Sequence, residues 1–180
     1  MKRIFIGSST EALTQALKIE AILSRVPGIE VLCWQDAFPL GSLTFEAIER
    51  LVDDLTGAII IASPDDVCKR RRAKGSSRKN SPCPPCRVPR ANVMIEWGLL
   101  TGILGRDRVI LCWYEGVNKP SDLLAITYCP MGVFSRKRRI LGAAKEQLVR
   151  WAKGLPRVAH GVPSALVGHG YSGLWNVTID

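Results

Sequence analysis

Apolar residues follow two alternating patterns over the first 154 positions: short unbroken runs, and longer stretches with an apolar residue every three or four positions. Unbroken runs are typical of strands buried on both faces of a sheet, and the longer spacing is typical of amphipathic helices. Five runs predict strands, at residues 3–7, 29–34, 58–62, 108–113 and 131–134, the last at an edge. Four stretches predict helices, at 12–26, 43–55, 91–104 and 140–151.

Residues that start or stop helices mark the ends of these elements. The segment 8–11, Ser-Ser-Thr-Glu, has the Ser-x-x-Glu spacing of a capping box and predicts the start of the first helix. Pro27 and Gly28 are expected to end that helix. Gly57 is expected to end the second helix and Gly105 the third.

Strands that alternate with helices indicate an α/β fold, in which a parallel sheet is covered by helices on both faces. With five strands, the fold is expected to be flavodoxin-like, a three-layer arrangement with strand order 2-1-3-4-5. Ligands bind such sheets beyond the carboxyl ends of the strands, at the switch point between the first and third strands. The loops expected there are 7–9, 34–42 and 63–66.

The chain is expected to contain one complete domain, at residues 1–154, with a basic insertion at 68–90. From 155 to 180 the composition shifts to Gly, Pro, His and Ser before an apolar segment at 171–179 that resembles the beginning of a strand. We therefore expect residues 155–180 to be a linker and the start of a second domain that is missing or truncated.

The net charge of +9 comes from the insertion. Nine of the 25 basic residues lie between Lys69 and Arg90, a segment without Asp or Glu, and the other 16 basic residues balance 16 acidic ones. The segment is rich in Gly, Ser and Pro and lacks apolar periodicity, which predicts a long mobile loop. It also lacks the aromatic residues that nucleic-acid surfaces use for stacking, so the sequence favours attraction of a phosphate-bearing small ligand, or a solvated loop, over a nucleic-acid partner.

The remaining composition predicts a cytoplasmic protein with no membrane partner. The apolar beginning of the chain breaks at once into polar residues, unlike an export signal, and the later apolar stretches are too short or carry Glu96. Six cysteines are scattered along the chain, three of them in or beside strand-like runs, which suggests buried thiols in a reducing compartment.

One cysteine motif raises the alternative of a metal site. Cys83 and Cys86 form a Cys-Pro-Pro-Cys motif, which Cys68, His160 or His169 could complete as a zinc site. Since no second Cys-x-x-Cys is present, no metal is predicted.

Four motifs occur in order along the chain: Phe-Ile-Gly-Ser-Ser at 5–9, Trp-Gln-Asp at 34–36, Ser-Pro-Asp-Asp-Val at 63–67, and Pro-Arg-Ala-Asn-Val-Met-Ile-Glu-Trp-Gly-Leu at 89–99 with Gly-Ile-Leu-Gly-Arg at 102–106. Together they resemble the bacterial predicted nucleotide-binding TIR-like domains, including the TIR portion of TIR-STING antiphage effectors. The likeness covers roughly residues 3–151, and the sequence departs from the family in its long insertion between Val67 and Arg90.

The resemblance implies an NAD⁺ nucleosidase, an enzyme that cleaves the nicotinamide–ribose bond to give nicotinamide and ADP-ribose in antiphage defence. NAD⁺ would be the substrate, and no cofactor is implied. The implied partners are further copies of the chain, through TIR-type contacts that activate the enzyme, and a cyclic-nucleotide sensor domain that follows this segment. The alternative is a non-catalytic module that binds a nucleotide or self-associates.

The resemblance places the catalytic carboxylate at Glu96, the glutamate of the Asn-Val-x-x-Glu-x-Gly pattern. Its neighbours in the predicted helix are nearly all apolar, and a carboxylate there needs a reason. Loss of nicotinamide leaves positive charge on the ribose, which a fixed anion would stabilise. Because nicotinamide departs neutral, one carboxylate would suffice where ordinary glycosidases use two. Alternatively, Glu96 is a carboxylate that reaches solvent or caps a partly buried helix.

The other matching positions are expected either to bind substrate or to cap helices and turns. Gly7, Ser8 and Ser9 could hold a phosphate or ribose at a helix start, and Trp34 and Phe38 could stack on a ring. Polar contacts or caps are expected from Asp36, Asp65, Asp66, Arg90 and Asn92.

Overall fold

Five parallel strands form the central sheet, in the order β2-β1-β3-β6-β7. The computed structural model describes residues 1–37, 48, 50–68, 86–123, 126–135, 137 and 139–156. The strands are β1 at Lys2–Ser8, β2 at Ile29–Cys33, β3 at Gly57–Ala62, β6 at Val109–Glu115 and β7 at Cys129–Val133. Counted along the chain as first to fifth, they have the order 2-1-3-4-5, which confirms the flavodoxin-like prediction.

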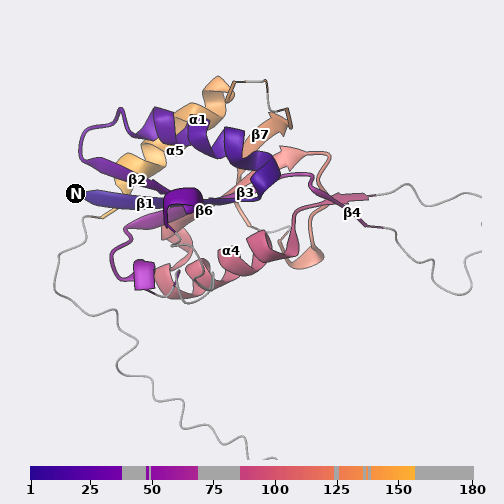
Figure 1. Ribbon diagram of the computed structural model, residues 1–180, viewed down its shortest axis with the longest axis horizontal. Helices are drawn as coiled ribbons and strands as arrows, with labels where there is room; N and C mark the ends of the chain where they lie inside the picture. Colours follow the sequence, from indigo (N-terminus) through magenta and orange to yellow (C-terminus); the bar gives the residue numbers. More distant parts are fainter. Residues whose placement is uncertain are drawn as a thin grey trace, which may run out of the picture.

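Helices cover both faces of this sheet, as Figure 1 shows. The helices α1, at Leu13–Leu23, and α5, at Gly142–Gly154, contact each other on one face, and α4, at Ala91–Leu104, lies on the other. A short helix, α2, at Trp34–Ala37, follows β2 directly. None of the described helices is long and apolar enough to cross a membrane.

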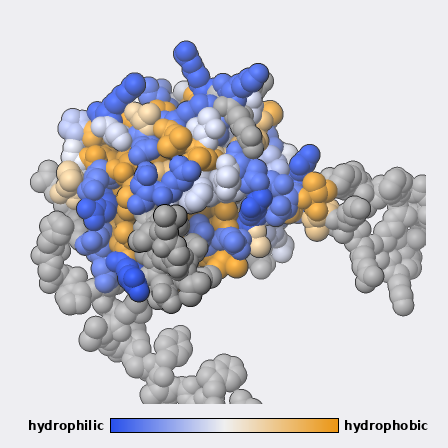
Figure 2. All heavy atoms as spheres, in the orientation of Figure 1, coloured by the Kyte–Doolittle hydropathy of each residue, from blue (hydrophilic) through white to orange (hydrophobic). Residues whose placement is uncertain are grey.

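The core is centred on β3, in which all six residues are buried. Unbroken apolar runs suit this position because both faces of the strand are covered by helices. In the view of Figure 2, long hydrophilic side chains project around the rim of the body, and hydrophobic residues appear in patches between them. The central strand therefore anchors the sheet, and its carboxyl end has a well-defined position.

The start of α1 differs from the predicted capping box by one residue. Ser9, not Ser8, is the cap, and its hydroxyl accepts a hydrogen bond of 3.2 Å from the backbone N–H of Ala12. Ser8 is still part of β1, and the first turn, η1 at Thr10–Ala12, is a tighter 3₁₀ turn. The carboxylate of Glu11 pairs with Arg90, the residue that precedes α4.

The prediction that Gly57 ends a helix was wrong. Residues 48 and 50–52 are helical, but Gly57 is the first residue of β3, beside Ile4 of β1. A Cβ at Gly57 would lie 2.8 Å from the carbonyl oxygen of Arg108, so the glycine allows a close approach of two chain segments. A helix stop and a close approach look alike in sequence because both favour glycine.

The basic insertion begins and ends in a short antiparallel hairpin that the sequence did not predict. The strands are β4 at Asp66–Cys68 and β5 at Cys86–Val88, and β4 projects beyond the body of the domain in Figure 1. Strands this short can be held by backbone pairing alone and need no apolar periodicity, so the apolar pattern of the sequence did not predict them. Residues 69–85, including Cys83, lie outside the described residues, as do 157–180 with the predicted linker and second domain.

The close approach at Gly57 leads to a stability prediction. We expect Gly57→Ala to lower the free energy of unfolding by about 1–3 kcal/mol, because the new methyl group would press on Arg108 and on Leu155, whose Cδ1 is 2.9 Å from that position. Urea unfolding measures the change. The matched control is Gly102→Ala in α4, where a Cβ meets no atom within 4 Å and helix propensity should stabilise the protein. Equal effects of the two variants would contradict the prediction.

Candidate active site

A pocket of about 170 Å³ lies beyond the carboxyl ends of β1 and β2, next to the beginning of α4. Its lining residues come from the turn after β1, the start of α2 and the first turns of α4: Ser8, Ser9, Thr10, Trp34, Arg90, Asn92, Val93 and Glu96. This is the end of a parallel sheet where ligands are expected. Three segments distant in sequence therefore meet at the predicted position.

Glu96 lies on the wall of this pocket, close to the backbone of β1. Glu96 lies on the same face of α4 as Asn92 and Val93, because these residues precede it by four and three positions. A Cβ added at Gly7 would lie 3.3 Å from Oε2 of Glu96 and 2.7 Å from Cδ1 of Ile60. Glycine at position 7 thus leaves the space in which the carboxylate sits.

The environment of Glu96 disfavours its charged form. Burial raises the pKa of its carboxyl from an ordinary value of 4.5 to about 7. Among the residues that the structure describes, none donates a hydrogen bond to this carboxylate or forms an ion pair with it. A carboxyl group in this state is available to a ligand, and perturbed carboxyl groups of this kind are concentrated at functional sites.

Hydrogen bonds hold two walls of the pocket in place. The indole Nε1–H of Trp34 donates to the hydroxyl of Ser8 at 3.0 Å, which fixes the ring beside the turn after β1. The hydroxyls of Ser9 and Ser63 are 3.3 Å apart, and Ser63 donates to Oδ2 of Asp65 at 2.8 Å. Ser63 was missed as a site residue because a serine at the end of an apolar strand gives no periodic signal.

The beginning of α4 combines a cation with free backbone donors. No side chain caps this helix, so its first N–H groups are left for water or a ligand. Arg90 precedes the helix and pairs with Glu11 at 2.5 Å, which joins α4 to the turn η1. The charge of Arg90 is shared with Glu11, and the N–H groups are the stronger candidates for an anion.

The structure brings together most of the residues that the sequence singled out. Gly7, Ser8, Ser9, Trp34, Arg90 and Asn92 surround Glu96, and Asp65 is linked to Ser9 through Ser63. Thr10 and Val93 also line the pocket, although the sequence analysis did not name them. Asp36 and Asp66 are exposed and do not line it, and Phe38 lies outside the described residues. The binding roles remain predictions.

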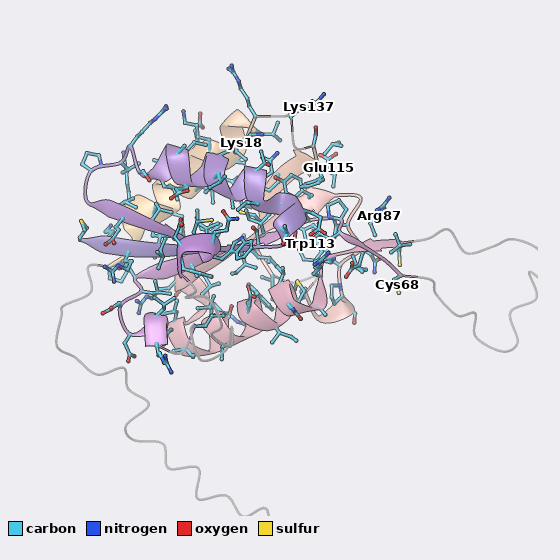
Figure 3. All side chains as sticks on the ribbon, viewed as in Figure 1. Lys18, Cys68, Arg87, Trp113, Glu115 and Lys137 are labelled. Atoms are coloured by element: carbon cyan, nitrogen blue, oxygen red, sulfur yellow. The ribbon has the colours of Figure 1, made fainter. Side chains whose placement is uncertain are left out.

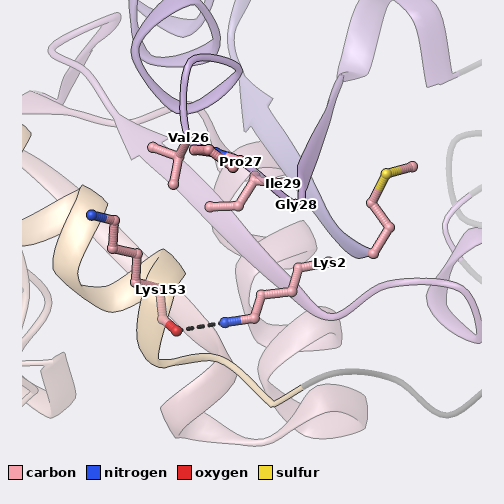
Figure 4. Close-up of a pocket in the computed structure, with 7 residues that line it drawn as sticks. Lys2, Val26, Pro27, Gly28, Ile29 and Lys153 are labelled. Carbon is pink, nitrogen blue, oxygen red and sulfur yellow. Dashed lines mark hydrogen bonds between the residues drawn. The ribbon is translucent and has the colours of Figure 1, made fainter.

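A larger hollow, of about 460 Å³, opens at the opposite end of the sheet (Figure 4). Its lining includes Lys2 at the start of β1, Ile29 at the start of β2, and Lys153. The Lys2 ammonium group donates hydrogen bonds to the carbonyl oxygens of Ala152 and Lys153 at the end of α5. The Lys2 ammonium group is already hydrogen-bonded, and no Asp or Glu is among the described residues that line this hollow. It is therefore a weaker candidate for an active site than the smaller pocket.

Within the described part of the chain, no group of three or more His, Cys, Asp or Glu side chains could hold a metal ion. Cys68 and Cys86 lie on the hairpin, whereas Cys83, His160 and His169 lie outside the described residues.

Residues 3–132 match the family model of the CAP12/Pycsar effector protein TIR domain, more than half of the chain. The chain belongs to this family. Its TIR domain is 35% identical over 130 residues to a Pycsar effector protein of Burkholderia cepacia, covering 71% of this chain and 39% of that relative. It is 31% identical over 156 residues to CD-NTase-associated protein 12 of Sphingobacterium faecium, and this match covers 84% of this chain and 44% of that relative.

A Pycsar effector protein of Pseudomonas aeruginosa is 36% identical over 126 residues, which is 69% of this chain and 37% of that relative. The matches to this TIR domain thus span less than half of the length of these relatives. They confirm the predicted family, and the match of the family model includes the whole of α4 with Glu96.

The raised pKa of Glu96 predicts a pH-dependent stability. The folded protein retains a proton that the unfolded chain releases between pH 4.5 and about 7, so stability falls as the pH rises through this window. We expect Glu96→Gln to raise the free energy of unfolding by about 2 kcal/mol near pH 8 and to change it little below pH 4.5. Urea unfolding across this range measures it, with the exposed Glu146→Gln as control. A destabilised Glu96→Gln variant at high pH would contradict the assignment.

Proposed function

We propose that this TIR domain cleaves NAD⁺ at the bond between nicotinamide and ribose, with Glu96 as the catalytic carboxylate. The observation that carries the proposal is the half-buried carboxyl of Glu96, which has no protein partner among the described residues and borders a pocket at the carboxyl end of the sheet. Membership of a TIR effector family supports it.

The proposed reaction needs one negative charge at one position. When the carbon–nitrogen bond breaks, nicotinamide leaves with the bonding electrons as a neutral molecule, and C1′ of the ribose becomes cationic. An ionised Glu96 stabilises that cation more strongly than it would in water, because its partial burial lowers the local dielectric. Water then adds to C1′ and releases a proton, which gives ADP-ribose.

The remaining pocket residues fit the non-reacting parts of the substrate. The ring of Trp34, fixed by its bond to Ser8, offers a surface on which nicotinamide can stack. The uncapped start of α4 offers N–H groups to a phosphate, and Ser9 and Asn92 offer hydrogen bonds to ribose hydroxyls. These groups would hold C1′ beside Glu96.

The size of the pocket supports a dependence on assembly. Sites for ligands of drug size usually enclose about 300–1,000 Å³. At about 170 Å³, the described pocket lies below this range and is too small to enclose the whole dinucleotide. We infer that other residues, from this chain or from a second copy, complete the site in the active assembly.

The names of the relatives suggest the biological setting. They are called Pycsar effector proteins and a CD-NTase-associated protein. We propose that the domain acts as an effector in antiphage defence, and that a cyclic-nucleotide sensor in the full-length protein promotes its assembly.

The second candidate is a module that only binds a nucleotide or associates with itself. The exposed side of α4 favours it, because the helix is apolar nearly all round and Ile95 is 49% exposed. The two candidates share the pocket and differ in whether bond cleavage occurs.

The catalytic role of Glu96 is tested by its amide variant. We expect Glu96→Gln to lower the rate of nicotinamide release from NAD⁺ by about 10²–10³-fold, because the amide cannot balance the ribosyl cation. Released nicotinamide is measured by chromatography at high protein concentration, with Glu146→Gln as the matched control. Unchanged release from Glu96→Gln would exclude this catalytic role. If the unmodified protein releases none in any assembled state, the binding module is the better description.

The pH profile provides an independent test. Only the ionised carboxylate can stabilise the cation, so kcat/KM should rise about tenfold per pH unit below the pKa of about 7 and level off above it. Initial rates on either side of this value, at NAD⁺ concentrations below KM, measure the profile. A rate that is flat or falls as the pH rises through 7 would require a different group.

A further inference from the structure

Two thiols face each other across the hairpin at the base of the basic insertion. Cys68 of β4 is directly opposite Cys86 of β5 in the antiparallel register. Side chains of directly opposed residues project from the same face of a hairpin. The Sγ of Cys86 donates a hydrogen bond of 3.3 Å to the carbonyl oxygen of Cys68, which shows how close the two residues are.

The spacing of opposed residues suits a disulfide bond. Directly opposed residues in antiparallel strands have Cα atoms about 4.5–5.5 Å apart, depending on whether the pair is hydrogen-bonded. Cysteines joined by a disulfide have Cα atoms about 4.4–6.8 Å apart. Rotation of the side chains could therefore join the sulfurs, with little movement of the backbone.

Solvent access separates this pair from a second one in the same chain. Cys68 is exposed and Cys86 is partly exposed, and Figure 3 shows Cys68 on the part of the hairpin that projects from the body. Cys112 and Cys129 are also aligned, on β6 and β7, but are 0% and 1% exposed. The hydrogen bond with Cys129, together with burial, raises the pKa of the Cys112 thiol and lowers its reactivity.

We propose that Cys68 and Cys86 are an oxidation site that forms a reversible disulfide with small disulfide oxidants of the glutathione type. One protein thiolate attacks the oxidant, forms a mixed disulfide and releases one small thiol. The second protein thiolate then attacks the protein sulfur of that mixed disulfide and releases the other small thiol. The two cysteines thereby lose two protons and two electrons, and the oxidant is reduced to two thiols.

The bond would connect two segments that lead into the candidate active site. β4 begins directly after Asp65, and β5 ends two residues before Arg90. Oxidation would hold these segments together even when the insertion between them is cut. The proposal does not depend on NAD⁺ cleavage, because it concerns the hairpin alone.

The test uses the full 180-residue chain incubated with oxidised glutathione, blocked with an alkylating reagent and digested with trypsin without reduction. Trypsin cuts beside the basic residues of the insertion and yields peptide 51–69 with Cys68 and peptide 80–87 with Cys86. We expect mass spectrometry to find these two peptides joined through Cys68 and Cys86, with Cys83 alkylated and a mass lower by two hydrogens than the sum of peptide 51–69 and the peptide 80–87 alkylated at Cys83. Reduced glutathione should separate them, and Cys112 and Cys129 should remain free thiols.

Because peptide 80–87 also contains Cys83, two matched variants identify the partner. The joined peptides should persist in Cys83→Ser, and their yield should fall at least tenfold in Cys86→Ser. Loss of the joined peptides in Cys83→Ser, equal yield in Cys86→Ser, or a Cys68 that remains alkylated in oxidised protein would each overturn the proposal.

Discussion

The close packing of α4 against the end of β1 is the constraint on which the candidate site depends. Gly7 is paired with Ile60 in the fully buried centre of the sheet, and its missing side chain leaves room for the Glu96 carboxylate. The apolar core on both sides of β3 holds β1 and β3 in register, so the backbone at Gly7 and Ile60 has a fixed position beside Glu96. The same packing removes water from Glu96 and raises its pKa. Position and chemistry at this site thus have a common origin.

The fold could be predicted from the sequence because its strongest signals are local. The apolar run of β3 and the length of α4, bounded by Gly105, appear in the sequence at nearly the observed residues. The hairpin β4–β5 could not be found in this way, since three-residue strands are held by backbone pairing and not by an apolar pattern. The role of Gly57 also depends on a distant partner, the carbonyl of Arg108, which no local pattern reveals.

The candidate site was predictable where chain topology alone decides position. Turns that follow adjacent parallel strands must meet, and this rule brings the turn at Ser8 and Ser9 next to Trp34. It does not determine which way a side chain points once the strand has ended. Asp36, two residues into α2, is exposed, and Asp66 belongs to the projecting hairpin. Ser63 lies in the loop 63–66 that the sequence places at this end of the sheet, but its individual role follows only from its hydrogen bonds with Ser9 and Asp65.

The attachment of α5 determines where a mechanical signal could enter this domain. The end of α5 is bound to Lys2, and Leu155 packs beside Gly57, both at the amino ends of the strands. Glu96 is at the other end of the sheet. A force applied at residue 156 would therefore act at the end of the sheet opposite the pocket. It would have to pass along the full length of a tightly packed core before it altered the pocket. Such a core transmits a rigid rotation of the domain better than a gradual deformation, so a force applied there would turn the pocket together with the domain and leave its shape unchanged.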